Sequence, residues 1–166
     1  MKIIPNVSFV LRENNEYVKK NTEFYFKNKK IVLFALPGAF TPTCSDYHLP
    51  SYEQRYEEII GYGINEVYCL SMNDPFVQKI WKDTYNIKKV KFIPDGNGDF
   101  TKAMNMLTDR SESGMGDRSF RYSMYVDDMN IVKLFKDENG KFDVSDSNTM
   151  ITVSYTHLTL PTNREV

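Results

Sequence analysis

The sequence predicts an α/β fold with a mixed β-sheet flanked by helices, and three patterns predict it. Short β-favouring apolar runs alternate along the chain with apolar residues at helical spacing, which is typical of layered α/β and α+β proteins. Two apolar runs, residues 31–36 and 67–72, flank a helical segment, so we expect these strands to be parallel. Two later runs, residues 120–126 and 131–135, follow each other closely and predict an antiparallel hairpin.

The elements of the first half follow from local patterns. Residues 7–11 form an apolar run, and residues 17–26 carry β-favouring side chains after a polar break, so together they predict a hairpin. Residues 31–36 are apolar throughout, which favours a central strand buried on both faces. Apolar residues then recur at helical spacing over residues 49–60, and two glycines follow.

In the second half, residues 67–72 predict another buried strand. A helix capped within residues 73–74 then runs to about residue 85. Its apolar spacing is expected to turn three side chains toward the core: Phe76, Ile80 and Trp81. Residues 91–94 predict a short strand, and residues 100–107 a helix.

Length and composition indicate one globular domain. The chain has 166 residues, 41% of them hydrophobic, two cysteines and a formal net charge of −1. Two cysteines cannot form a disulfide framework, and this length can bury a core without one. Balanced charge argues against a nucleic-acid partner, which usually needs a basic surplus. No apolar run approaches the roughly 20 residues that span a bilayer, so no membrane partner is expected.

The N-terminal residues do not have the pattern of a secretory signal. Residues 1–11 carry a single lysine and lack the apolar core of a signal peptide. We therefore expect a cytoplasmic protein, or an organellar one if a transit peptide has been removed.

The stretch PGAFTPTCS, from Pro37 to Ser45, links the central strand to the following helix. Thr43 and Asp46 have the spacing of a capping box, so we expect Thr43 to be the N-cap and Cys44 the first helical residue. Unpaired N–H groups and the helix dipole at that end favour a thiolate. Cys44 is therefore predicted to be an activated nucleophile at the carboxyl end of a central strand. A buried structural cysteine is the alternative.

This stretch resembles the active-site motif Pro-x-x-x-Thr-x-x-Cys of peroxiredoxins, and more narrowly the peroxiredoxin-5 type, also called the type II plant or antioxidant-protein group. Matching blocks follow in the same order: HLP at 48–50, VYCLSMNDPFV at 67–77, Trp81, FIPDG at 92–96 and RSFRYSM at 118–124. The resemblance implies a thioredoxin-like fold. It also implies a thiol-dependent peroxidase that reduces hydrogen peroxide and alkyl hydroperoxides through a cysteine sulfenic acid.

The resemblance assigns catalytic roles to four residues. Cys44 matches the peroxidatic cysteine that attacks the peroxide. Thr41 matches the threonine whose hydroxyl holds peroxide and thiolate, and Arg121 the arginine that stabilises negative charge on sulfur and oxygen. Pro37 matches the proline that shields the pocket from water. An in-line displacement needs such a fixed nucleophile with donors aimed at the oxygens.

Other residues have open alternatives. His48 could contact the active site, position the helix or an interface, or pair with Cys44 on a metal. Two ligands do not complete a zinc site, so we expect neither a metal nor another cofactor. Cys69 lies within a strand and is expected to be a packing residue. Arg118 could support the pocket or lie solvated at the surface. By resemblance, Phe40 lines a homodimer interface.

The sequence departs from the family pattern in two places. Some members carry a resolving cysteine near residues 143–148, where this chain has none. The resemblance then implies a 1-Cys mechanism, with an external thiol such as glutathione with glutaredoxin, or thioredoxin, as reductant. Family members also continue into an apolar-striped helix, whereas residues 152–161 are Thr-rich without a stripe. We therefore expect the domain to cover residues 1–151 and residues 152–166 to be an atypical, non-native tail.

Two other functions use the same cysteine. A peroxide sensor or redox chaperone would pass the oxidation of Cys44 to a client protein. A cysteine hydrolase would need His48 as its base, but a histidine four residues along the same helix is poorly placed for that role.

Overall fold

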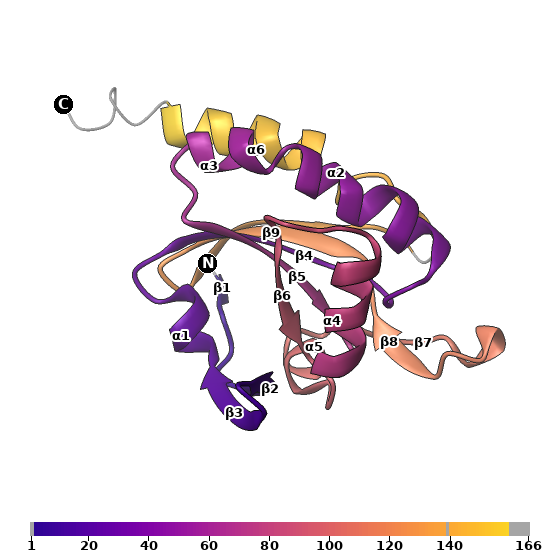
Figure 1. Ribbon diagram of the computed structural model, residues 1–166. Coiled ribbons are helices and arrows are strands. Elements are labelled where there is room, and N and C mark those ends of the chain that lie inside the picture. Colours follow the sequence, from indigo (N-terminus) through magenta and orange to yellow (C-terminus); the bar gives the residue numbers. More distant parts are fainter. Residues whose placement is uncertain (1, 139, 160–166) are drawn as a thin grey trace.

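The fold was obtained as a computed structural model, which describes residues 2–138 and 140–159 (Figure 1). A six-stranded sheet crosses the middle of the molecule in the order β1-β10-β9-β4-β5-β6. In that order the strands are β1 (Lys2–Ile3), β10 (Asn130–Lys136), β9 (Tyr122–Asp127), β4 (Lys30–Ala35), β5 (Glu66–Ser71) and β6 (Lys91–Pro94). Strands β4, β5 and β6 are parallel, and the remaining pairings are antiparallel. The predicted mixed sheet, parallel pair and late hairpin are confirmed.

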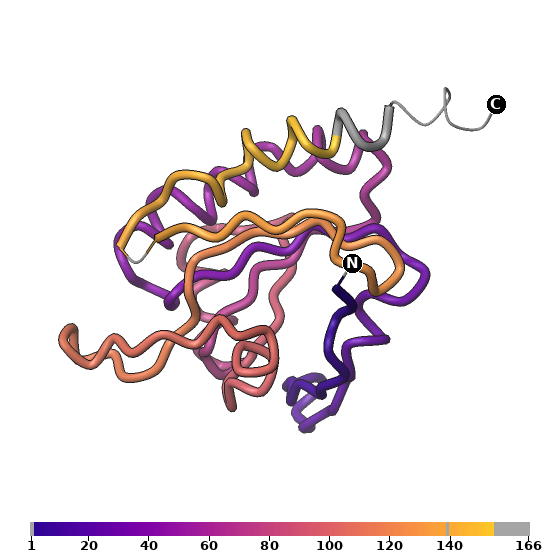
Figure 2. Tube along the Cα trace, turned by 180° about the vertical axis from the view of Figure 1, so that it is seen from behind, coloured from indigo at the N-terminus to yellow at the C-terminus, as the bar shows by residue number. Residues whose placement is uncertain are grey.

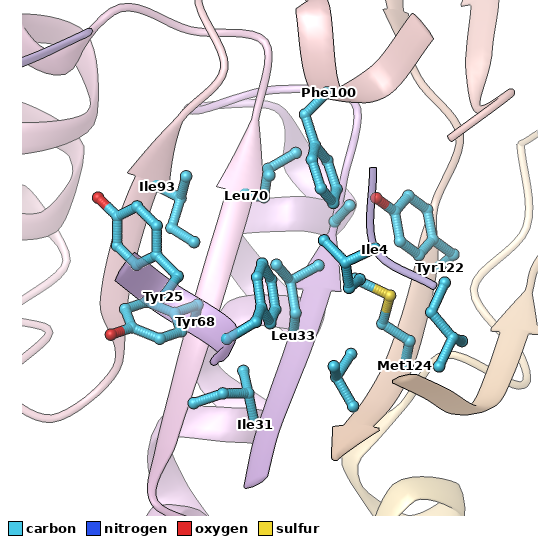
Figure 3. Close-up of a cluster of buried hydrophobic side chains, with 14 of the residues drawn as sticks. Ile4, Tyr25, Ile31, Leu33, Tyr68, Leu70, Ile93, Phe100, Tyr122 and Met124 are labelled. Atoms are coloured by element: carbon cyan, nitrogen blue, oxygen red, sulfur yellow. The ribbon is translucent and has the colours of Figure 1, made fainter. Parts of the chain in front are cut away.

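The central strand β4 is buried on both faces, as its unbroken apolar sequence predicts. Its alternate side chains enter two separate hydrophobic clusters. Ile31, Leu33 and Ala35 belong to the first cluster, which Figure 3 shows in part. Val32 and Phe34 enter the second cluster on the opposite face, which also contains Cys44.

The first cluster is covered by α1 (Thr22–Phe26), α5 (Asp99–Ala103) and the hairpin of β2 (Ser8–Glu13) and β3 (Glu16–Asn21). The predicted strand over residues 17–26 is wrong in its second half, which forms α1. Asn21 causes the change, because its Oδ1 accepts the N–H of Phe24 at 3.0 Å and caps a helix. Burial of Tyr25 and Phe26 then holds α1 on the sheet.

The second cluster is covered by a π-helical turn η1 (Cys44–His48), α2 (Leu49–Gln54), α3 (Tyr56–Gly61) and α6 (Ser147–Thr159). Figures 1 and 2 show α6 running alongside α3. The predicted single helix over residues 49–60 is therefore two helices. It breaks at Arg55, whose φ of −102° and ψ of 10° are not helical.

Helix α4 (Pro75–Thr84) begins as predicted, because Asp74 Oδ1 accepts the N–H of Val77 at 2.9 Å. Trp81 is fully buried, but Phe76 and Ile80 are 49% and 56% exposed, so their predicted inward orientation is wrong. The inner face of the helix carries Gln78 instead. Its amide nitrogen donates to the hydroxyl of Ser71 and to the carbonyl of Ile93, each at 3.0 Å. The buried amide donors are therefore satisfied by hydrogen bonds.

A second hairpin projects from the body of the molecule in both views (Figures 1 and 2). It contains β7 (Leu107–Asp109), a 3₁₀ turn η2 (Ser111–Ser113) and β8 (Asp117–Ser119). The predicted helix over residues 100–107 ends at Ala103, because Asn105 takes a left-handed φ of 61°. Within the described ranges, no helix is both long and apolar enough to cross a membrane.

Helix α6 extends past residue 151 into the Thr-rich segment, where the sequence shows no apolar stripe. The helix continues to Thr159. Met150 and Ile151 are buried against the second cluster and dock its first turns. Ser154, one turn after Met150, is also fully buried, so the inward face changes from apolar to polar at this point.

Candidate active site

Cys44 lies in the helical segment that follows β4 and is fully buried. The segment becomes helical at Pro42, and the N–H of Ser45 donates to the carbonyl of Thr41 at 2.9 Å. Thr43 has a helical backbone and its side chain caps nothing, so the predicted capping box is wrong. Proline lacks an N–H and suits the first helical position, which moves the helix start upstream. Cys44 still lies in the first turn, near the positive end of the helix dipole.

The turn that carries Cys44 is a π-helical turn. In η1 the N–H of Leu49 reaches the carbonyl of Cys44, five residues back. Such turns are rare and occur frequently at functional sites. The sequence shows no local signal for this widened turn.

Arg121 connects Cys44 to His48. It lies between β8 and β9, more than 70 residues from either partner in the chain, and is buried. Nη2 donates to Cys44 Sγ at 3.2 Å, and Nη1 donates to His48 Nδ1 at 2.9 Å. A guanidinium keeps its charge and holds its donors in a fixed fork, so it can stabilise negative charge on this sulfur. The structure thus brings together two of the four predicted catalytic residues and adds His48.

His48 is a neutral, fully buried imidazole. Burial lowers its pKa well below the ordinary value, and the charge of Arg121 lowers it further, against a raising effect of the hydrogen bond to Ser145. Its Nε2–H donates to the Ser145 carbonyl at 3.1 Å, while Nδ1 accepts from Arg121. Both ring nitrogens are occupied, so the imidazole has no free lone pair for Cys44. This arrangement gives no support to the cysteine hydrolase alternative, which needs His48 as a base for Cys44.

The other predicted catalytic residues surround this centre. The Thr41 hydroxyl donates to the carbonyl of Gly38 at 2.7 Å, and the structure shows no hydrogen bond between it and Cys44. Pro37 is buried, and its carbonyl accepts from Arg118 Nη1 at 3.2 Å. Arg118 Nε also donates to the carbonyl of Met115 at 3.0 Å, so this arginine supports the pocket.

Asn73 and Gly38, which the sequence analysis did not name as site residues, lie against and within the loop before Cys44. Asn73 Oδ1 accepts the N–H of Ala39 at 2.9 Å. Gly38 packs closely against Arg118, because a Cβ at this position would lie 2.4 Å from Arg118 Nη1 and would require that side chain to move. The exposed Phe40 takes a left-handed φ of 64°, which is strained for a bulky side chain.

A small cavity adjoins the buried centre. Its volume is about 90 Å³, compared with roughly 30 Å³ for one molecule of liquid water. Its wall consists of Pro37, Thr43, Arg110, Arg121, Glu138, Gly140 and Lys141. The volume can hold a small molecule beside the guanidinium of Arg121, and neither Cys44 nor Thr41 is among the lining residues.

Cys69 lies in β5 and belongs to the same cluster as Cys44. Burial raises the pKa of its thiol well above the ordinary value; Cys44 raises it further and Arg121 opposes the rise. Both cysteines are free thiols. In the part of the chain that the structure describes, no three His, Cys, Asp or Glu side chains converge to hold a metal ion.

Comparison with known proteins agrees with this geometry. The Redoxin family pattern matches residues 1–151. A peroxiredoxin of Synechocystis sp. is 46% identical over 89% of this chain and 87% of its own length. Peroxiredoxin-2B of Arabidopsis thaliana is 37% identical over 84% and 86%. The crystal structure of the Plasmodium falciparum antioxidant protein, a 1-Cys peroxiredoxin, superposes with a TM-score of 0.88 at 35% identity, covering 93% of this chain and 98% of that one. The thioredoxin-like fold is confirmed.

Proposed function

Because this chain belongs to the Redoxin family and is a peroxiredoxin, a thiol-dependent peroxidase, we propose that Cys44 is its peroxidatic nucleophile. The observation that carries this assignment is the bond from Arg121 Nη2 to Cys44 Sγ at 3.2 Å in a buried site. A fixed positive donor in a water-poor site stabilises a thiolate far better than the same contact at the surface.

The reaction follows from this placement. The Cys44 thiolate attacks one peroxide oxygen, an S–O bond forms, and the O–O bond breaks. The departing oxygen takes a proton and leaves as water or alcohol, while Cys44 becomes a sulfenic acid. Negative charge moves from sulfur to the departing oxygen, and the guanidinium of Arg121 can stabilise both because it has five donors.

Pro37 and Thr41 support this step in our proposal. Pro37 forms part of the cavity wall and keeps bulk water from the sulfur. The Thr41 hydroxyl, which now donates to Gly38, can turn to contact a bound peroxide. Pre-positioning of this kind lowers the entropic cost of the displacement.

The sulfenic acid is reduced by an external thiol in our proposal. Cys69 is the other cysteine of the chain, and it is a buried residue of β5 with a raised pKa. A protein thiol cannot reach a fully buried sulfur, so η1 must open before a mixed disulfide can form. Glutathione with glutaredoxin, or thioredoxin, would supply the electrons, and these reductants fit a reducing compartment such as the cytoplasm.

We also propose a homodimer through the face that carries Phe40. Phe40, four residues before Cys44 in the chain, is 46% exposed, and Tyr47 in η1 is 64% exposed. Exposed aromatic residues of this kind are enriched in interfaces between subunits. Light scattering after size-exclusion chromatography should give twice the monomer mass, and Phe40→Asp should shift it to the monomer.

Residues 152–166 form a non-native tail in our proposal, attached to a domain of residues 1–151. The support is Ser154, whose buried Oγ has no hydrogen-bond partner among the described residues. An apolar side chain would be expected on this face of α6. Accurate mass of the protein isolated from its source should lack the tail; finding residues 152–166 in that mass refutes the idea.

Peroxide consumption with glutathione and glutaredoxin, run beside thioredoxin, tests the whole proposal. Turnover is expected with one of the two systems. Cys44→Ser should abolish turnover, whereas Cys69→Ser should leave it unchanged. Activity that survives Cys44→Ser refutes the assigned nucleophile. If Cys44 oxidises and neither system supports turnover, the sensor or redox-chaperone function is favoured instead.

A further inference from the structure

A buried hydrogen-bonded clamp joins the end of β10 to the start of α6. Asp137 follows β10 and is 2% exposed. Its Oδ1 accepts the N–H of Val144 at 2.6 Å, and its Oδ2 accepts the hydroxyl of Ser145. The backbone N–H of Asp137 donates to the carbonyl of Arg121 at 2.9 Å. Asp137 therefore holds the loop on one side and the backbone of Arg121 on the other.

The loop that Asp137 holds presents one carbonyl to the active-site helix. The carbonyl of Ser145 accepts Nε2–H of His48 at 3.1 Å and the hydroxyl of Tyr52 at 2.8 Å. An acceptor at Nε2 keeps the imidazole proton there, so the lone pair is at Nδ1. Arg121 has only donors, and its 2.9 Å contact with Nδ1 requires that lone pair. The other neutral tautomer would set two N–H groups against each other.

We propose that Asp137 and Ser145 are positioning residues for peroxide reduction, because their clamp fixes the tautomer and place of His48, which in turn holds the Arg121 guanidinium on Cys44. This inference rests on the proposed roles of Cys44 and Arg121. The order of contacts is Asp137, Ser145, His48, Arg121 and Cys44, and each link is a hydrogen bond of the structure. Buried chains of this kind lose much of their effect when one link is removed.

Several charged and titratable groups lie around Cys44 within the described residues. Arg121 donates to both Cys44 Sγ and His48 Nδ1, and Cys69 faces the site from β5. The adjoining cavity is lined by Arg110, Glu138 and Lys141. The carboxylate of Asp137 makes no hydrogen bond to the Arg121 guanidinium. The hydrogen-bonded route from this carboxylate to Cys44 therefore passes through Ser145 and His48. Ser145 lies in the segment where some family members carry a resolving cysteine, and in this chain that segment supports the arginine.

Two variants break the clamp while keeping the Ser145 carbonyl in the chain. Asp137→Asn weakens both contacts of the carboxylate, and Ser145→Ala removes only the hydroxyl contact. Thr149→Ala is the matched control. It removes the hydrogen bond from the Thr149 hydroxyl to Asp146 Oδ1 at the start of α6. This bond lies next to the clamp and is not part of it. All proteins carry Cys69→Ser and His157→Gln, so that Cys44 is the one thiol and His48 the one histidine that the measurements detect.

Three measurements on the full chain separate positioning from simple stabilisation. Stopped-flow reaction with hydrogen peroxide gives the rate constant, absorbance at 240 nm gives the pH midpoint of thiolate formation at Cys44, and ¹⁵N NMR gives the His48 tautomer. For Asp137→Asn we expect a rate about tenfold lower, a midpoint at higher pH and loss of the pure Nε2–H tautomer. Ser145→Ala should show the same changes to a smaller extent. Thr149→Ala should change thermal stability alone.

The proposal is overturned if Asp137→Asn and Ser145→Ala keep the parent rate, midpoint and tautomer. It is also overturned if Thr149→Ala, at the same loss of stability, lowers the rate constant as much as Asp137→Asn and Ser145→Ala do. If Asp137→Asn does not fold, Ser145→Ala decides by the same three readouts. Failure of the proposed function looks different, because Cys44→Ser would then retain peroxide reduction in the parent background.

Discussion

Replacing His48 with glutamine should make the stability of this peroxiredoxin less sensitive to acid. Glutamine can accept from Arg121 and donate to the Ser145 carbonyl, so both contacts of the imidazole can persist. It cannot bind a proton. The comparison therefore isolates the titration of one buried ring.

The direction in which stability changes with pH depends on whether the native or the unfolded state binds the proton. Burial holds the pKa of His48 well below its ordinary value of 6.5 in the native state. The unfolded chain has the ordinary pKa, so below pH 6.5 only the unfolded state binds this proton. Native stability is complete above that pH and falls as the pH drops. At pH 5.5, one unit below the ordinary pKa, the loss is about 1.4 kcal/mol.

Urea unfolding at pH 7.5 and pH 5.5 measures this loss. His157→Gln is included in both proteins, because the chain has two histidines. Carboxylates titrate equally in the two proteins and cancel in the comparison. The parent should lose about 1.4 kcal/mol more than His48→Gln between the two pH values. Equal losses would mean that His48 takes up its proton in the native state and would refute the neutral imidazole.

Three other substitutions test separate parts of the structure. Arg121→Lys replaces the forked guanidinium, which bonds both Cys44 Sγ and His48 Nδ1, by a point charge. The rate constant with hydrogen peroxide should fall about 10–100-fold in stopped-flow measurements. A change below about twofold contradicts the role of the guanidinium fork. Ser154→Ala removes a buried hydroxyl with no partner among the described residues, and urea unfolding should show a gain of about 1 kcal/mol; a loss would mean that the hydroxyl is satisfied. Gly38→Ala puts a methyl group 2.4 Å from Arg118 Nη1 and should displace that arginine, slow peroxide reduction and lower the thermal midpoint. Its control is Gly61→Ala, where nothing lies within 4 Å, and this variant should show none of these three effects.

The strands were predicted better than the helix boundaries. Residues 31–36 and 67–72 are apolar at nearly every position, and only a strand between two layers buries both sides of such a run. The helix boundaries depended on contacts that local spacing does not contain. Pro42 shifted the helix start, so that the pairing of Thr43 with Asp46 formed no capping box. Phe76 and Ile80 followed a helical period and are nevertheless exposed, because buried partners for Gln78 turned the helix another way.

The sequence by itself determined the alternation of strands and helices, the family and the cysteine at the start of a helix, because these depend on residues close together in the chain. It also determined that no cysteine follows Cys69. Only the tertiary structure decided the environment of Cys44. Arg121 and Ser145 lie far along the chain from His48, and folding brings them to it through hydrogen bonds that span 73 and 97 residues. Asp137 in turn holds Ser145. Such contacts have no spacing rule, since the chain between them can take any path that buries both partners.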